Sequence, residues 1–548
     1  MIESPDNVAR IFELDQDLNK HLHLLNVHAM VAHFQDFADS HATGMYSRIC
    51  DKYAEIAAKT AWIRPELLSL SCDTLQQYRQ SAVLQPYLRV FDQIVRYKPH
   101  TLSEPEETLL SAASSALSAS RNTYGHLTNA DLVFTKIENE KGEKVELTKG
   151  NYLNMLKSQS RTVRKAAFSS RYDAYIAHKS SICSMIDGSV KSELFYQKAQ
   201  RFPSCLEHSL FADNIPVSVY HSLISTVHAH LPTFYRYLSC RQRVLGLPTL
   251  DMYDLYVPLV KDVDLTITYE TACDWVLAAL APFGPEYVAT AKDGLLGEGR
   301  WVDVFETKGK RSGACSIQNA GGKQYMMLNF TGTMSNAFTL AHELGHSMHH
   351  HYSTQSQPHR YAFPSLAVCE VASTVNEALL FHYLLNKAVA EGNTQMEKYL
   401  LNIRCEDFKG TLIRQTQFAE FELRLHEMAE QGKALTPDSI SALYKEINDV
   451  YYGDVSAHTD PSTPPPKYPH VLKADPRIAY EFMAVPHFFT PFYVYKYSTS
   501  FSVAEALVPG IVAGDKDVLD KYFTLLRVCS SYSVLSFSIL LFLLFFHG

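Results

Sequence analysis

Two histidines and a glutamate constrain the fold of this chain more than any other stretch. Residues 341–348 read Ala-His-Glu-Leu-Gly-His-Ser-Met, so His342 and His346 are four positions apart. On an α-helix, four steps of about 100° return a side chain to within about 40° of its starting direction. The two imidazoles then project from one helical face, as two ligands of one Zn²⁺ ion must. This stretch therefore predicts a helix that carries two metal ligands.

Glu343 lies between these histidines, where a carboxylate can accept a proton from water at the metal. In a chain of this composition such a motif arises by chance about one time in ten, so a polar helix in a histidine-rich chain is the open alternative. His349–His351 follow directly, and His350 is also four positions from His346. If His350 were the ligand, Glu343 would lose its place beside the water, so these three are interpreted as a solvated helix end.

A third ligand is needed, and Glu370 is the candidate. It lies 24 positions after His346, which leaves enough chain for a loop and a second helix. The stretch 368–377 is an apolar helical pattern with two acids, and a carboxylate there is costly unless it is paired or bound to metal. Glu377, seven positions on, is a candidate partner that orients a ligand histidine. The alternatives are a solvated acid at Glu370 and a structural ion pair at Glu377.

Glycine at position 345 stands inside the predicted motif helix. It costs about 1 kcal/mol relative to alanine in a helix interior. We therefore expect another backbone to approach closely at Gly345, with simple tolerance as the alternative.

An aromatic stretch near the end of the chain reads Pro-His-Phe-Phe-Thr-Pro-Phe-Tyr-Val-Tyr-Lys-Tyr over 486–497. Neutral imidazole and phenol groups can donate hydrogen bonds to the oxyanion that a reacting carbonyl develops. On composition alone, an aromatic core cluster is the commoner interpretation. The candidate donors are His487, Tyr493, Tyr495 and Tyr497.

Charge and cysteine content narrow the class of protein. The 548 residues carry a net charge of −8 with no basic stripe, which argues against nucleic acid and favours small molecules or peptides as partners. The ten cysteines form no CxxC pair, so buried or free thiols are favoured over disulfides. The N-terminus Met-Ile-Glu-Ser-Pro-Asp-Asn has neither a basic region nor an apolar one, so a cleaved signal is not expected. A cytoplasmic protein fits best.

Hydrophobic periodicity predicts a mainly α chain with a few short strands. A hairpin is expected over 131–148, an extended connector over 252–258, a strand or turn over 301–305, a loop over 309–313, a strand over 324–330 and a Pro-rich loop over 461–469. Ser335 or Asn336 is expected to cap the motif helix. Helices are expected over about 7–82, 84–97, 109–124, 151–245 (broken near 202–203 and 214–216), 268–280, 335–350 and 365–387.

Together these stretches resemble the M3 family of zinc oligopeptidases, in its oligoendopeptidase F branch. The resemblance is carried by Thr-Leu-Ala-His-Glu-Leu-Gly-His-Ser-Met-His at 339–349, Glu-Val-Ala-Ser-Thr-Val-Asn-Glu at 370–377 and the 486–497 stretch. It runs from about Val8 to about Leu525. It implies a two-lobed helical body with a deep channel that admits only short, unstructured peptides, cleaved at internal bonds.

The resemblance also implies roles. His342, His346 and Glu370 would bind one Zn²⁺, with Glu343 as general base. His487 and Tyr495 would match the donors to the transition state, with Tyr493 a nearby alternative. Residues 325–330 would match the edge strand that pairs with substrate. The implied domains are an N-terminal helical segment (1–65), an oligoendopeptidase F N-terminal-type domain (66–140), an M3 catalytic domain (141–527) and an atypical apolar tail (528–548).

The two chain ends depart from the family pattern. The start is short, and residues 528–546 carry no charge where polar helices would be expected. An altered gene end is favoured over a short membrane anchor, since about 20 apolar residues span a bilayer and this segment includes five serines. The alternative function is an inactive metal- or peptide-binding protein. Neither oligomeric state nor cleavage preference follows from the sequence.

Overall fold

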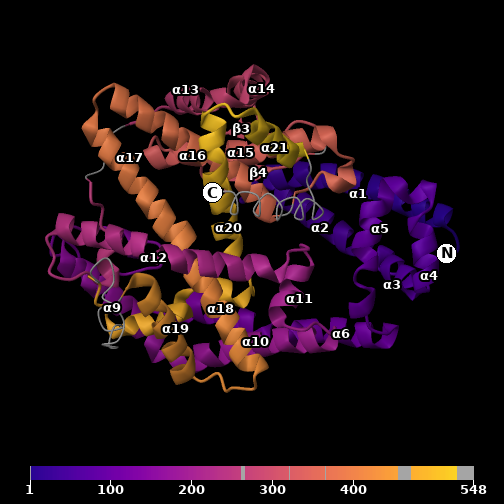
Figure 1. Ribbon diagram of the computed structural model, residues 1–548, viewed down its shortest axis with the longest axis horizontal. Coiled ribbons are helices and arrows are strands. Elements are labelled where there is room, and N and C mark those ends of the chain that lie inside the picture. Colours follow the sequence, from indigo (N-terminus) through magenta and orange to yellow (C-terminus); the bar gives the residue numbers. More distant parts are fainter. Residues whose placement is uncertain (1, 261–265, 320, 365, 454–470, 528–548) are drawn as a thin grey trace. The chain divides into compact units, whose positions relative to one another are not determined.

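Helices dominate the computed structural model, which describes residues 2–260, 266–319, 321–364, 366–453 and 471–527 (Figure 1). The mainly α class expected from the sequence is confirmed. The chain forms two compact units, each assembled from separate segments. Unit 1 comprises Met1–Glu104, Asp264–Gly392 and Ser500–Gly548, and unit 2 comprises Pro105–Val263 and Asn393–Thr499. The domain boundaries at 65, 140 and 527 stay a prediction.

The N-terminal part of unit 1 is helical, as expected. Its first helix begins with Pro5, whose preset φ suits a first turn, and the Ser4 side chain accepts the Asn7 N–H. Phe12 of this helix, Leu67 and Phe91 are buried in one apolar cluster. The elements are α1 Pro5–Gln35, α2 Ser40–Thr60, α3 Ile63–Ser69, α4 Cys72–Arg79, η1 Ala82–Tyr87, α5 Leu88–Val95 and η2 Lys98–His100.

The rest of unit 1 surrounds the motif helix α15, Met334–Ser356, and its neighbour α16, Leu366–Ala390. Figure 1 shows α13 and α16 lying near α15. Gly345 of α15 meets the backbone of α16, which confirms the close approach expected there. The other elements are α13 Tyr269–Ala279, η5 Ala281–Phe283, α14 Pro285–Leu296, η6 His359–Tyr361, the end of α20 Tyr495–Val512, and α21 Lys516–Arg527.

A three-stranded sheet packs on α15. Its order is β3 (Val302–Asp303), β5 (Tyr325–Met327), β4 (Cys315–Ile317), with β3 parallel and β4 antiparallel to β5. The strands expected at 301–305 and 324–330 are therefore present, and β4 was missed. The prediction that 325–330 form an edge strand is wrong, because β5 is paired on both sides. The Ser316 hydroxyl of β4 lies 2.8 Å from that of Ser347 on α15.

Unit 2 is almost wholly helical. The predicted breaks near 202–203 and 214–216 separate α10, α11 and α12. The first part comprises α6 Glu104–Leu117, α7 Ala119–His126, η3 Leu127–Asp131, α8 Tyr152–Leu156, α9 Arg161–Ala177, α10 Lys179–Ala199, α11 Cys205–Phe211 and α12 Val217–Leu245. The second part comprises α17 Thr394–Asp407, η7 Phe408–Ile413, α18 Arg414–Glu430, α19 Pro437–Tyr452, η8 Pro476–Ala484, η9 Pro486–Phe489 and the start of α20.

The hairpin predicted over 131–148 is present in unit 2. Its strands are β1 Ile137–Glu138 and β2 Lys144–Val145, which are antiparallel. The extended connector predicted at 252–258 is wrong at its start, where Met252–Asp254 form the 3₁₀ turn η4. The Asp251 and Asp254 side chains cap this turn reciprocally. The Pro-rich loop and the apolar tail lie outside the described residues.

The motif helix is capped by Thr333, not Ser335, and Asn336 reaches back to the Thr333 N–H from the third position. Within the described ranges, no helix has the length and hydropathy needed to cross a bilayer. No disulfide joins any two of the nine described cysteines.

Candidate functional site

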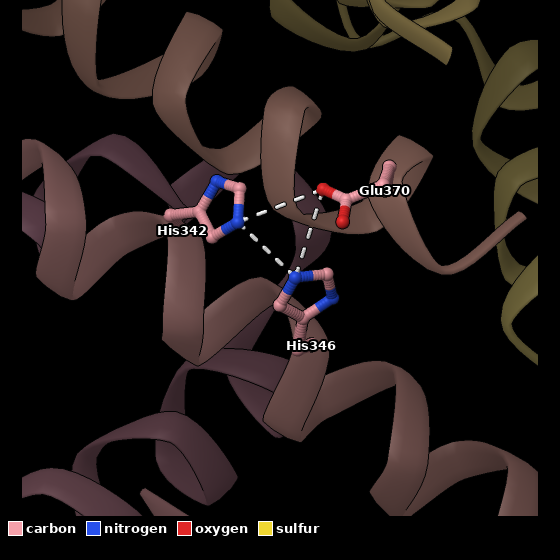
Figure 2. Close-up of side chains that lie close together, drawn as sticks. All are labelled: His342, His346 and Glu370. Atoms are coloured by element: carbon pink, nitrogen blue, oxygen red, sulfur yellow. Dashed lines mark hydrogen bonds and ion pairs between the residues drawn. The ribbon is translucent and has the colours of Figure 1, made fainter. Parts of the chain in front are cut away.

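Three side chains of unit 1 converge on one point, as Figure 2 shows. His342 and His346 come from one face of α15, and Glu370 comes from the first turns of α16. The two histidine Nε2 atoms are 3.1 Å apart. The nearer carboxylate oxygen of Glu370 lies 3.6 Å from Nε2 of His342 and 3.8 Å from Nε2 of His346. The three predicted ligands are thus brought together.

This triangle fits a zinc ion. With bonds of about 2.0–2.1 Å in a tetrahedral site, two ligand atoms lie about 3.3 Å apart. The three separations of 3.1, 3.6 and 3.8 Å bracket that value. Two imidazole nitrogens and one carboxylate oxygen also make a donor set typical of catalytic zinc, which leaves a fourth position for water or substrate.

Neighbouring side chains fix the orientation of both imidazoles. Glu377 lies two helical turns after Glu370 on the same face of α16. Its carboxylate oxygen Oε1 is 2.5 Å from Nδ1 of His342. A carboxylate there holds the proton on Nδ1 and leaves Nε2 as the ligand atom. Nδ1 of His346 lies 3.1 Å from the Cys369 sulfur. Sequence reasoning missed Cys369, although its position beside Glu370 in the apolar stretch was a usable signal.

Glu343 is buried beside this cluster, with 7% of its surface exposed. Burial raises the pKa of Glu343 to about 7; the His342 charge opposes this shift, and Glu370 and Glu377 add to it. The Ser316 N–H of strand β4 donates a hydrogen bond to its carboxylate. A carboxyl group held in this environment is suited to taking up and releasing a proton near neutral pH.

The histidines that follow the motif are not a solvated helix end. His349 is 0% and His350 7% exposed, so that prediction is wrong for both. Burial lowers the pKa of each to about 3, and neighbouring histidine charges contribute. Nδ1 of His350 is 3.4 Å from the Ser316 hydroxyl oxygen, and its Nε2 is 3.8 Å from the Cys369 sulfur. His350 is therefore not part of the group of metal-ligand candidates formed by His342, His346 and Glu370.

The aromatic donors belong to unit 2, where they divide into two sets. The ring of His487 stacks on that of Tyr493 at 6.0 Å, and Tyr497 lies 5.4 Å from Tyr493. His487 is exposed, and the two tyrosines are partly exposed. Tyr495 is 1% exposed and packs on Tyr220 at 5.0 Å, and its hydroxyl has no partner among the described residues.

A buried carboxyl group supports this segment, and sequence reasoning missed it. Phe492 has φ 53°, an unusual value for a residue with a side chain. Its N–H donates to Glu422 of α18 at 3.1 Å. Burial raises the pKa of Glu422 well above its usual range, although this bond opposes the shift. Glu422 therefore accepts a hydrogen bond from the backbone immediately before Tyr493 and holds this segment in place.

Sequence comparison identifies the family. The model of peptidase family M3 matches residues 154–537, and the oligopeptidase F model matches residues 66–134. Oligopeptidase PepF of Bacillus subtilis is 38% identical over 97% of this chain and 76% of its own length. Group B oligopeptidase PepB of Streptococcus agalactiae is 36% identical over 97% of this chain and 85% of its own.

Structural comparison agrees. A crystal structure described as a peptidase of Chlamydophila abortus matches with a TM-score of 0.89 and 29% identity, covering 97% of this chain and 86% of that one. The oligoendopeptidase-F of Enterococcus faecium matches with a TM-score of 0.70 and 31% identity, covering 96% and 86%. The chain therefore belongs to peptidase family M3, in the oligoendopeptidase F branch, and is a metallopeptidase of oligopeptides.

Proposed function

We propose that this protein is a zinc-dependent endopeptidase that hydrolyses internal bonds of short, unstructured peptides in the cytoplasm. His342, His346 and Glu370 hold a single ion. The observation that carries the proposal is the convergence of their three ligand atoms at 3.1–3.8 Å, beside a buried general-base candidate. The oligopeptidase names of its relatives support the substrate class.

The chemistry divides between the ion and the protein. A zinc ion at this site would acidify water and polarise the scissile carbonyl. Glu343 takes the proton from the attacking water and delivers it to the leaving nitrogen. Glu377 keeps the Nε2 atom of His342 available as a ligand.

The candidate donors to the developing oxyanion are His487 and one of the tyrosines that the family resemblance singles out. Burial lowers the pKa of His487, so its imidazole is neutral at pH 7 and one ring N–H can donate. We place Tyr493 beside it in this role, because the two rings stack and both are accessible. Tyr495, the donor implied by family resemblance, would first have to expose its buried hydroxyl.

The test is zinc stoichiometry measured together with cleavage of an internally quenched peptide of about ten residues. We expect one zinc per chain and cleavage between internal residues. A chelator should abolish cleavage, and added zinc should restore it. Cleavage that is insensitive to chelator would contradict the proposal. A zinc-loaded, cooperatively folded chain without turnover would favour the rival, a metal- or peptide-binding protein.

A further inference from the structure

A pocket with a volume of about 590 Å³ is lined by residues of unit 2 alone. That volume falls in the range of small-molecule sites, about 300–1,000 Å³. One wall is a single face of α9, since Phe168, Arg171, Tyr172 and Tyr175 follow the i, i+3, i+4, i+7 pattern of one helical stripe. Helix α7 contributes Arg121 and Tyr124, and the turn η9 contributes the Phe489 ring, which stacks on Tyr124 at 4.3 Å.

The charge in this pocket is unbalanced. Its lining includes four cations, Arg121, Lys149, Arg171 and Arg414, and a single carboxylate, Glu481. Glu481 is already satisfied, because Arg414 donates to it at 2.7 Å and the hydroxyls of Tyr172 and Tyr444 at 3.0 and 2.6 Å. Three cations therefore face a pocket whose only acid is paired, in a chain of net charge −8.

Arg171 is held in place without an anion of its own. Its guanidinium lies over the Tyr152 ring at 4.3 Å and near Tyr175 at 5.7 Å. Stacking on a ring face leaves the edge of the guanidinium free to donate. Its Nε is buried, with no hydrogen-bond partner in the described part of the chain. The charge of Glu481 reaches Arg171, but no hydrogen bond joins the two.

Lys149 faces the same space from the other side. Its ammonium donates to the Asn129 side chain at 2.9 Å, which is a neutral partner. Partial desolvation lowers the pKa of the exposed Lys149, and so does the charge of Arg171, because the two cations repel each other. An anion between them would remove this repulsion and satisfy the unused donors.

We propose that this pocket binds an organic oxyanion, a carboxylate or phosphate group held by Arg171 and Lys149 on a body that packs against the Tyr124, Tyr152 and Phe489 rings. A small inorganic anion would leave most of the volume unfilled, which is why the ligand carries an organic body. The carboxylate of a peptide and an organic phosphate present the same chemistry. The turn η9 carries both Phe489 and His487. A ligand in the pocket therefore contacts the turn that positions the His487 side chain.

The test is calorimetric titration of the full chain with N-acetyl-phenylalanine, its carboxamide and phenyl phosphate. We expect the carboxamide to bind at least about tenfold more weakly than the two anions, since charge-assisted bonds are lost. Arg171→Gln and Lys149→Gln should each weaken anion binding by about tenfold. Arg236→Gln, an exposed arginine on α12 that does not line the pocket, is the matched control and should bind as wild type does.

The outcomes separate the two sources. Tighter binding of the carboxylate supports a peptide, and tighter binding of phenyl phosphate supports an organic phosphate. Equal binding of acid and amide, or anion binding that both variants retain, would overturn the proposal. Lys149 is exposed, so its variant remains informative if Arg171→Gln does not fold. Binding is measured without cleavage, so its failure is distinct from failure of the zinc peptidase proposal.

Discussion

Gly345 on α15 touches the backbone of Ala372 on α16 so closely that a Cβ on Gly345 would lie 2.5 Å from the Ala372 carbonyl oxygen. It would also lie 2.6 Å from the Cα of Ser373. Both obstacles are backbone atoms, so no side chain can rotate away. The closeness of the two helices is what brings Glu370 of α16 within reach of the α15 histidines.

Gly345→Ala should therefore lower both stability and zinc affinity. Alanine is favoured over glycine by about 1 kcal/mol in helix propensity. However, its Cβ needs about 3.5 Å to the Ala372 carbonyl oxygen, so the two helices have to separate by about 1 Å. Such overpacking typically costs 1–3 kcal/mol. We expect a lower melting temperature and weaker zinc binding. Gly410→Ala, where no atom lies within 4 Å of the added Cβ, is the control. Unchanged zinc affinity in Gly345→Ala would contradict the account of this contact.

Glu377→Gln should weaken zinc binding without removing a ligand. The amide is neutral and can present its NH₂ group to Nδ1 of His342, which disfavours the tautomer that binds metal through Nε2. Loss of such a partner costs about 10–100-fold in metal affinity. The measurement is a competition titration against a zinc-binding dye. Glu391→Gln, one residue beyond α16 and paired with Lys387 at the surface, should match wild type. Equal affinities in the two variants would assign Glu377 a purely structural role.

Asp251→Asn should stabilise the protein more at pH 8 than at pH 4. Burial raises the pKa of Asp251 to about 6 from its usual 3.8 or so, although the Met252 and Asp475 N–H groups oppose this shift. The folded state therefore holds a proton that the unfolded state has lost between about pH 4 and 6, so stability falls as pH rises through that window. Asparagine removes the buried charge and keeps an acceptor for the turn. Thermal melts of both proteins across this range are the measurement, and a pH-independent difference would contradict the prediction.

His487→Gln should lower kcat by about 10²–10³-fold with a smaller effect on KM, as expected when a donor to a transition state is lost. His230→Gln on α12, which is also exposed, is the control. Tyr493→Phe should behave like His487→Gln. If kcat fell further in Tyr495→Phe than in Tyr493→Phe, the donor would instead be Tyr495, as the family resemblance implies. The Tyr495 hydroxyl would then have to become exposed through a movement of the protein.

Local spacing predicted much of this protein, and long-range packing accounts for what it missed. The four-residue interval between His342 and His346 is a property of the helix itself, and the apolar setting of Glu370 marks it as a costly acid. The burial of His349 and His350 arises only in the fold, where β4 and the Cys369 sulfur lie against His350 on α15. Their sequence alone resembles a polar helix end.

Strand order and ring direction are similarly non-local. Residues 325–327 have the pattern of a strand, but whether a strand is central or at an edge depends on partners at 302–303 and 315–317. Tyr495 is the first residue of α20 and Tyr493 lies two positions before it, so only packing decides which ring faces Tyr220 and which faces His487. By contrast, the Asp251 and Asp254 interval was a usable capping signal for the turn η4.

The central claim is that Glu343 is the general base beside a metal held by His342, His346 and Glu370. The most direct measurement is cleavage of the quenched peptide by Glu343→Gln, an almost isosteric change at a buried position, with zinc content determined on the same preparation. We predict the wild-type zinc content and a fall in kcat of about 10³-fold or more, since general acid–base catalysis contributes about 10²–10⁴-fold. Wild-type cleavage by the zinc-loaded variant would contradict the account.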